Sequence, residues 1–317
     1  MKTSFFPKNE NFVADTVLMV RPLHFGYNAQ TAESNHYQQK PDEAATEIAQ
    51  KALAEADLFC QQLKEAQIEV LRYDDLPETP DALFPNNWIV FHRCGKISLF
   101  PMAAPNRRLE RRLQVVLDIL EENNFFYQNI FDYTSYENEN QFLEGTGSLL
   151  IDRQNRVVYA ARSERTQEAP LLHFCKDFNY KPILFDAFVE PNSENRVYHT
   201  NVLMALSPKV AVICLEAIPE GAEKTQLLET LADTGKQVLP ISFAQKQAFA
   251  GNLLFLKNKK GKHFWVLSQT AFEALQETQK ATLAQEGDFI VAAIPTIERI
   301  GGGSVRCMLA EVLNPKK

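Results

Sequence analysis

The chemistry that this sequence suggests centres on one cysteine near its C-terminal end. Residues 300–309 read IGGGSVRCML, which places Cys307 directly after Arg306 and shortly after three consecutive glycines. Adjacent glycines are costly in conformational entropy, so they indicate a sharp turn or the close approach of another group. A neighbouring cation favours the thiolate, the nucleophilic form of cysteine. We interpret Cys307 as a candidate nucleophile; the simpler alternative is a tight loop around a buried structural cysteine.

A nucleophilic cysteine needs an acid or base, and a group that orients that base. Among six histidines, His199 stands out because it lies between Tyr198 and Thr200, at the entrance of a predicted strand. Glu144 lies between an apolar Leu143 and a glycine. These two residues are the candidate base and its partner, with a structural histidine and a turn carboxylate as the simpler alternatives.

Short strand patterns alternate with helical patterns along the chain. Strands are predicted for residues 14–21, 68–72, 88–92, 148–152, 157–160, 202–206, 210–214, 237–241, 252–257, 265–268 and 289–297. Helices are predicted for residues 42–66, 106–123, 171–179, 220–234 and 269–286. A hairpin, a helix and a further strand therefore recur as a ββαβ unit, and about five such units fit the length. This predicts an α/β fold of modules around a common centre, as in propellers, in one domain spanning residues 1–317.

Polar clusters interrupt the apolar strand patterns at strand ends. They are FPNNW (84–88), LEGTGS (143–148), YHTN (198–201), FAGN (249–252) and the glycine and cysteine segment, with a sixth cluster at 19–35 after the first strand. In a modular α/β fold we expect such strand ends to converge on one opening.

Composition excludes several classes of function. The chain of 317 residues has 33 Lys and Arg against 40 Asp and Glu and no basic stripe, so no nucleic acid or anionic membrane partner is predicted. Five widely spaced cysteines without a CxxC pair predict neither a disulfide framework nor a metal site, and they are typical of a cytoplasmic protein. Neither a signal peptide nor a membrane span is predicted. A homo-oligomer is left open.

The order Glu-Gly, His-x-Asn and GGG followed by RCM resembles the guanidine-group-modifying superfamily of arginine and agmatine deiminases, dimethylarginine hydrolases and amidinotransferases. FPNNW, LEGTGS, YHTNV, FAGN and IPTIE with GGGSVRCM are similar to its citrulline-utilisation hydrolase branch, across nearly the whole chain. The resemblance implies a five-bladed α/β propeller, the pentein fold, with no metal or cofactor. It also implies that Cys307 is the nucleophile, His199 the general acid/base and Glu144 its carboxylate partner.

The chain departs from the family pattern at two positions. Family deiminases hold the cationic guanidinium with two aspartates, where this chain has Asn87 and Asn201. Carboxylates suit a cation, whereas an asparagine offers an acceptor and a donor without charge, which suits a neutral ureido group. We therefore predict hydrolysis of citrulline to ornithine, CO₂ and ammonia. Asn86 is an alternative pocket residue, and a simple Asn-Asn turn is the other alternative.

The amino-acid end of such a substrate needs groups for a carboxylate and an ammonium. Arg21, Asn35, Arg162 and Arg165 lie in segments similar to the family's substrate loops, and Arg165 with Asn35 is the preferred pair. The alternatives are an arginine deiminase or dihydrolase, an amidinotransferase, and a non-enzymatic module that binds a free amino acid. The complete set of cysteine, histidine and carboxylate argues against the last.

Overall fold

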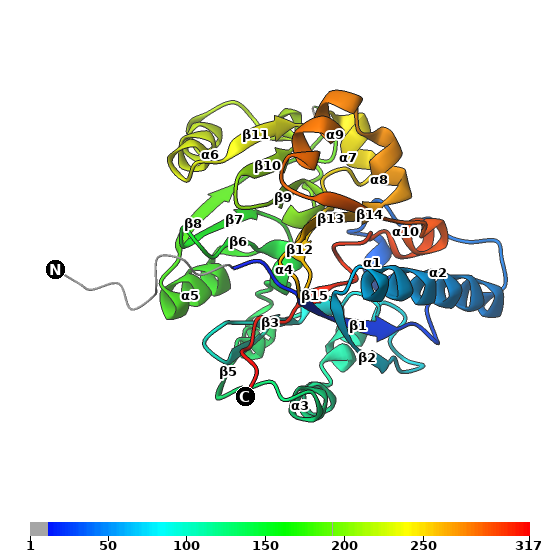
Figure 1. Ribbon diagram of the computed structural model, residues 1–317. Helices are drawn as coiled ribbons and strands as arrows, with labels where there is room; N and C mark the ends of the chain where they lie inside the picture. Colours follow the sequence, from blue (N-terminus) through cyan, green and yellow to red (C-terminus); the bar gives the residue numbers. More distant parts are fainter. Residues whose placement is uncertain (1–11, 192) are drawn as a thin grey trace.

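Five small sheets form a ring around the middle of the molecule, with the connecting helices on the outside (Figure 1). The computed structural model describes residues 12–191 and 193–317. The prediction that the N-terminus carries no signal peptide concerns mainly residues 1–11, which lie outside the described residues. Within the described part of the chain each sheet has three strands.

The sheets follow one another along the chain. Their strands, from the centre outward, are β3 (Ile89–Phe91), β4 (Lys96–Leu99) and β5 (Asn129–Asp132); β6 (Leu150–Asp152), β7 (Val157–Ala161) and β8 (Lys181–Phe185); β9 (Met204–Leu206), β10 (Val210–Ile213) and β11 (Gln237–Pro240); β12 (Leu254–Lys257), β13 (His263–Ser268) and β14 (Asp288–Ala292); and β15 (Ala310–Glu311), β1 (Thr16–Arg21) and β2 (Glu69–Asp74). The last sheet combines strands from both ends of the described chain and so closes the ring.

Every sheet has the same pairing. Its first two strands are antiparallel and its last two are parallel. Antiparallel strands can be joined by a short turn, whereas a parallel pair needs a long crossover. The crossovers carry α2 (Ala45–Glu65), α3 (Leu113–Glu122), α5 (Glu168–Phe178), α6 (Ala222–Asp233), and α8 (Gln269–Ala274) with α9 (Glu277–Ala284). The predicted α/β class and the repeated ββαβ unit are confirmed.

The middle strands are buried over most of their length, and two of them completely. β7 has the sequence VVYAA and β10 the sequence VAVI, and every residue of both is buried. Strands that are covered on both faces read as continuous apolar runs. The two tryptophans, Trp88 and Trp265, are fully buried.

Several predicted boundaries were wrong. Predicted helix 106–123 is a 3₁₀ segment (Pro105–Glu110) followed by α3, and predicted helix 269–286 is broken at Leu275, which has extended backbone. Predicted strand 289–297 ends at Ala292, because Pro295 begins α10 (Pro295–Gly301).

Four strands were missed. β4 and β5 are only four residues long and β15 only two, β5 is largely exposed, and β8 contains Pro182, so none shows a clear apolar pattern. The remaining short helices are α1 (Ala29–Ala32), α4 (Gly145–Ser148) and α7 (Phe243–Gln247), and further 3₁₀ segments are Pro85–Asn87, Thr134–Glu139, Thr200–Val202 and Leu215–Ala217.

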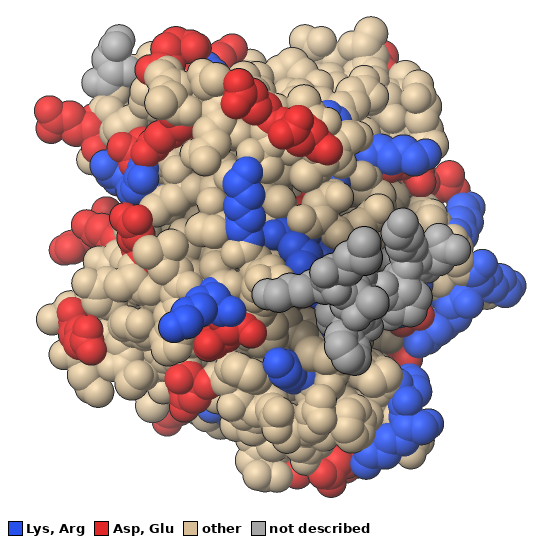
Figure 2. All heavy atoms as spheres, turned by 90° about the vertical axis from the view of Figure 1, so that its left-hand side faces the viewer, with Lys and Arg blue, Asp and Glu red and all other residues tan. Residues whose placement is uncertain are grey.

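The described surface carries charges of both signs. Figure 2 shows basic and acidic side chains intermingled over one face, with no broad region of a single sign among the described residues. No helix of the described segments combines the length and the apolar character needed to cross a membrane.

Close packing of turns at the centre of the ring leads to a stability prediction. A Cβ atom on Gly251 would lie 2.6 Å from the carbonyl oxygen of Val202 and 2.8 Å from the carbonyl carbon of Leu203, so two backbone segments would have to move apart. We expect Gly251→Ala to lower the free energy of unfolding by about 1–3 kcal/mol. Gly26→Ala is the control, because no atom lies within 4 Å of its Cβ position. Equal denaturant midpoints for the two variants would contradict this account.

Candidate active site

Five of the six polar clusters meet because each precedes the innermost strand of one sheet. These inner strands are β3, β6, β9, β12 and β15, and a tight turn stands before each of them. Hydrogen bonds join neighbouring turns around the centre. The hydroxyl of Thr146 donates to the carbonyl of Asn86, and that of Thr200 to the carbonyl of Ser148.

Asn252 continues this ring of hydrogen bonds towards the C-terminal turn. Its Nδ2 donates to the carbonyl of Asn201 at 2.8 Å, and its Oδ1 accepts the backbone N–H of Arg306 at 3.0 Å. The candidate residues of four turns are thereby fixed relative to one another, and the expected convergence of strand ends is found.

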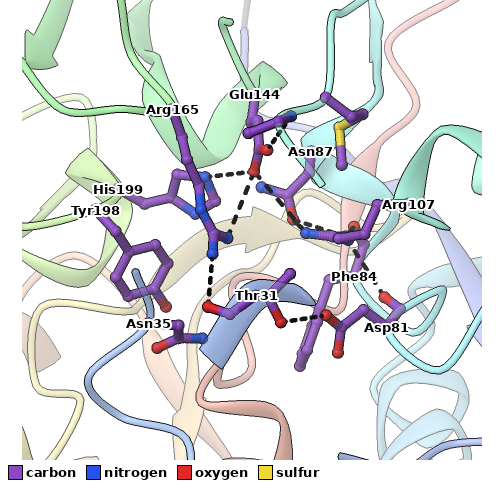
Figure 3. A network of polar contacts seen from close by, with 12 residues as sticks. Thr31, Asn35, Asp81, Phe84, Asn87, Arg107, Glu144, Arg165, Tyr198 and His199 are labelled. Atoms are coloured by element: carbon purple, nitrogen blue, oxygen red, sulfur yellow. Dashed lines mark hydrogen bonds and ion pairs between the residues drawn. The ribbon is translucent and has the colours of Figure 1, made fainter. Parts of the chain in front are cut away.

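Glu144 and His199 form a buried pair at the centre of Figure 3. His199 Nε2 and Glu144 Oε2 are 2.9 Å apart, and both side chains are almost completely buried. The other oxygen of Glu144 accepts the backbone N–H of Ala103 at 3.0 Å. The guanidinium groups of Arg165 and Arg107 lie 3.7 and 3.9 Å from Oε2.

These neighbours decide the charge of the carboxylate. Burial alone would raise the pKa of Glu144, but Arg165, His199 and Arg107 outweigh it and lower the pKa to about 2. An ionised carboxylate only accepts hydrogen bonds, so His199 Nε2 is the donor.

His199 is neutral near pH 7. Burial is the largest cause that lowers its pKa, to about 4, against the opposing effect of Glu144 and with the help of Arg165 and Arg107. Because Nε2 carries the hydrogen, Nδ1 of the neutral ring holds a free electron pair. The side chain lines the same cavity as Cys307. His199 can therefore accept a proton within this cavity.

Amide groups surround the sulfur of Cys307. Nδ2 of Asn252 lies 3.3 Å from Sγ, and the amide nitrogen and oxygen of Asn201 lie 3.7 and 3.8 Å from it. The guanidinium of Arg306 instead donates to the carbonyl of Leu309 and to Glu311.

The expected stabilisation of the free thiolate by Arg306 is not found as a net effect. Burial raises the pKa of the Cys307 thiol, and Arg306, Asn252 and Asn201 only partly offset this effect. A fully buried sulfur loses more solvation on ionisation than these groups restore.

Asn87 presents one edge of its amide to the cavity. Arg107 donates through both terminal nitrogens to Asn87 Oδ1, each at 3.2 Å (Figure 3). Arg107 is itself held by Glu110 at 2.8 Å. An arginine can only donate, so the oxygen of Asn87 must face it. Nδ2 of Asn87 is buried and has no hydrogen-bond partner among the described residues.

The three glycines allow close packing, as expected. Gly302 ends α10 in the left-handed region with φ of 60°, and Cβ atoms on Gly301 and Gly303 would lie 2.8 and 3.0 Å from the ring of Phe84. Asn35 donates to the carbonyls of Gly301 and Gly302. Asn35 lines the cavity and also holds the glycine segment.

Arg165 lies at the same cavity, beside the ring of Tyr198. It donates to the carbonyl of Thr31 and to the hydroxyl of Ser34 (Figure 3). Asp81 also lines the cavity. One of its oxygens accepts from Asn28 and Thr31, and the other is buried without a partner among the described residues.

Three predicted substrate residues lie elsewhere. Arg21 is 39% exposed and forms an ion pair with Asp57. Arg162 forms ion pairs with Asp186 and Glu223. Both guanidinium groups therefore take part in ion pairs outside the cavity. Asn86 is fully buried but does not line the cavity.

Sequence reasoning missed Arg107, Asp81 and the contact of Asn252 with the sulfur. Arg107 belongs to a run of arginines that reads as a solvated helix face, and Asp81 to a turn rich in proline and aspartate. Asn252 was noticed within its cluster, but nothing local assigns it a role. Among the described residues, no group of His, Cys, Asp and Glu is arranged to hold a metal ion.

The fold and this site define an enzyme of the guanidine-group-modifying superfamily, the hydrolases and amidinotransferases of the pentein type. More narrowly, the chain belongs to the eukaryotic N,N-dimethylarginine dimethylhydrolase family, whose model matches residues 21–314. None of the curated proteins matches the chain.

Solved structures share the fold. The substrate-bound N-terminal domain of ArgZ, an arginine dihydrolase from the ornithine-ammonia cycle in cyanobacteria, has 16% identity and a TM-score of 0.73 over 95% of this chain and 98% of that domain. The chain spans only 41% of the ArgZ chain in its apo structure. SxtG, an amidinotransferase from Microseira wollei in saxitoxin biosynthesis, has 14% identity and a TM-score of 0.68 over 96% of both chains.

The raised pKa of Cys307 predicts how its reactivity depends on pH. A thiol with a raised pKa keeps its proton to higher pH, so alkylation of Cys307 by iodoacetamide should rise with a midpoint above the ordinary value of about 8.5. Asn252→Ala should raise the midpoint further and slow alkylation at pH 8 about tenfold, because the thiolate loses a hydrogen-bond donor.

Mass spectrometry of the Cys307 peptide, in a Cys94→Ser background that removes the exposed thiol, measures these rates. Asn258→Ala is the matched control, because Asn258 is also buried but follows β12 instead of preceding it. Faster alkylation in Asn252→Ala would refute the assigned contact.

Proposed function

We propose that this protein is a cysteine-dependent hydrolase of the ureido C–N bond of citrulline, and that its five sheets are the blades of a single α/β propeller domain. The observation that carries the choice of substrate is the free N–H edge of Asn87. A guanidinium has only donors, so it would meet this edge donor to donor. The carbonyl oxygen of a ureido group is an acceptor and satisfies it.

Two features hold this preference in place. Arg107 fixes the Asn87 amide through its oxygen, so that the amide cannot turn its acceptor towards a guanidinium. Arg107 and Arg165 also give the cavity positive charge close to Glu144. A guanidinium placed between Asn87 and Asn201 would meet neutral amides at both positions and no carboxylate there.

The proposed reaction begins with a neutral thiol and a neutral imidazole. His199 accepts the thiol proton as Cys307 Sγ bonds to the ureido carbon, and Glu144 stabilises the imidazolium. His199 then gives the proton to the side-chain nitrogen as the bond between that nitrogen and the ureido carbon breaks. Ornithine leaves, and a carbamoyl thioester remains on Cys307. His199 activates water to cleave the thioester, and the resulting carbamic acid decomposes to CO₂ and ammonia.

The amides around the sulfur and the edge of Asn87 supply donors for negative charge that develops on the ureido oxygen and on sulfur. An independent finding supports the covalent step: the N-terminal domain of ArgZ has been observed covalently bound to a reaction intermediate.

The amino-acid end of the substrate has complementary charges within the same cavity. We propose that Arg165 binds the carboxylate of the substrate and that the unpartnered oxygen of Asp81 accepts a hydrogen bond from its α-ammonium group. Asn35 is then a residue that shapes the glycine segment beside the substrate. No role at the substrate is proposed for Arg21 or Arg162.

A guanidino substrate is the second candidate. The family description names dimethylarginine, and ArgZ is an arginine dihydrolase. These similarities favour arginine or a methylated arginine as the substrate. The neutral Asn87 and Asn201 argue against it.

The covalent step predicts the loss of turnover in Cys307→Ser. We expect activity on citrulline to fall at least about a thousandfold, because a hydroxyl has no accessible anionic form here. The assay incubates enzyme with citrulline, arginine, agmatine and dimethylarginine separately and measures ornithine and ammonia. Cys175→Ser, at a buried cysteine remote from the site, is the control. Retention of more than a few per cent of activity by Cys307→Ser would exclude covalent catalysis through this residue.

Substrate selectivity is the second prediction of the mechanism. We expect kcat/KM for citrulline to exceed that for arginine at least about tenfold, since each hydrogen bond to a charged group contributes roughly 1.5–3 kcal/mol and the guanidinium would lack two. Asn87→Asp combined with Asn201→Asp should lower this ratio. Asn86→Ala should leave it unchanged, because Asn86 neither lines the cavity, as Asn87 does, nor contacts the sulfur of Cys307, as Asn201 does. A wild type that hydrolyses arginine but leaves citrulline intact would favour the second candidate.

A further inference from the structure

A second cavity lies along the inner strands. The candidate active site occupies the turns where these strands begin, whereas a cavity of about 540 Å³ is lined by residues that extend from the turns before these strands to the residues just after them. Among these are Asp152 of β6, Ser207 after β9, Phe255 of β12 and Glu311 of β15. We call this space the distal cavity.

Two arginines of the distal cavity share one carboxylate. Arg153 Nη1 lies 3.3 Å from Glu311 Oε1, and Arg306 Nη2 lies 2.9 Å from Glu311 Oε2. Asp152, the other carboxylate of the lining, is already paired with Lys236 at 2.7 Å. The arginine pair therefore keeps one positive charge in excess.

Not all hydrogen-bond donors of Arg153 have a partner among the described residues. Its side chain is 9% exposed, and its Nε is buried with no hydrogen-bond partner among the described residues. Its hydrogen bond to Glu311 occupies one of its five N–H donors. A buried guanidinium with free donors is costly to keep unless an anion satisfies it.

The rest of the lining suits an apolar body. Leu150, Leu206, Leu253 and Phe255 contribute apolar surface, and His263 adds a further polar group at the lining. The volume lies within the range of about 300–1,000 Å³ typical of small-molecule sites.

We propose that the distal cavity binds a small organic carboxylate with a compact apolar body, held by Arg153 and Arg306, and that this ligand acts on the candidate active site. The linkage is direct along the chain. Arg306 is the neighbour of Cys307 and is tied through its backbone to Asn252, which contacts the sulfur. Thr146, which also lines the distal cavity, follows Glu144 by two residues. The effect on the active site depends on the proposed role of Cys307, whereas binding itself does not.

Binding is tested by calorimetry on the full chain with 3-phenylpropionate, its neutral amide and inorganic phosphate as probes. We expect the carboxylate to bind at least about tenfold more tightly than the amide, because only the anion makes charge-assisted hydrogen bonds. It should also bind more tightly than phosphate, which lacks the apolar body. Equal binding of the amide, or no binding of the carboxylate, would overturn the proposal without any variant.

Location is tested by Arg153→Gln, which should weaken carboxylate binding at least about tenfold. Arg112→Gln is the control, because it removes an arginine that donates to Asp74 on the outside of the ring. Arg153→Lys replaces Arg153→Gln if the latter fails to fold; it preserves the charge but not the planar fork, and we expect binding at least about threefold weaker. Unchanged binding in the folded variant would overturn the site.

Linkage is tested by the alkylation rate of Cys307 in the Cys94→Ser background, which requires no turnover. An anion on Arg306 reduces the positive potential at the sulfur, so saturating 3-phenylpropionate should slow alkylation about threefold. The amide should have no effect. An unchanged rate at saturation would overturn the linkage, and it would not bear on the identity of the substrate.

Discussion

The buried charge of Glu144 is the interaction on which the rest of the site depends. A carboxylate at the centre of the molecule is stable only because two arginines, an imidazole and a backbone N–H surround it. These contacts keep Glu144 ionised, which fixes the tautomer of His199. Burial, helped by the same two arginines, lowers the pKa of His199 and keeps the imidazole neutral in the resting state. One carboxylate thus sets the protonation of the pair and requires two cations in the cavity wall.

These cations also determine what the cavity accepts. Arg107 is needed near Glu144, and it turns the oxygen of Asn87 towards itself, leaving the amide hydrogens for a ligand. In a family known for guanidino substrates, this arrangement presents a donor where a guanidinium needs an acceptor. Charge balance around Glu144 and the proposed preference for a ureido oxygen are therefore two consequences of one arrangement.

The inner strands connect two chemically different ends of the ring. Where they begin, tight turns bring polar groups together through backbone hydrogen bonds and leave little space. The distal cavity along these strands is wider, and its lining contains two arginines that share Glu311. The short β15 spans both ends, since Cys307 precedes it and Glu311 completes it. A change at one end can reach the other through a few residues of backbone.

Much of this arrangement could be predicted from the sequence by itself. The alternation of hairpins and helices gives the ββαβ unit, because buried strands read as apolar runs and crossovers as amphipathic segments. Polar residues before inner strands, among them Cys307, His199 and Glu144, stand out because they interrupt such runs. The three glycines predict a close approach, which Phe84 makes.

Only the tertiary structure decided the rest, because it depends on groups that are distant in the chain. Arg107 looks like a surface residue until the fold places it against Asn87, twenty positions away. Burial, which no local pattern reports, raises the pKa of Cys307 against the effect of its neighbour Arg306. Arg21 and Arg162 lie in promising segments but point to ion pairs outside the cavity. The sequence determined which residue types stand where strands begin and end, since that is a local property; the orientation, charge and accessibility of each group were set by packing between sheets.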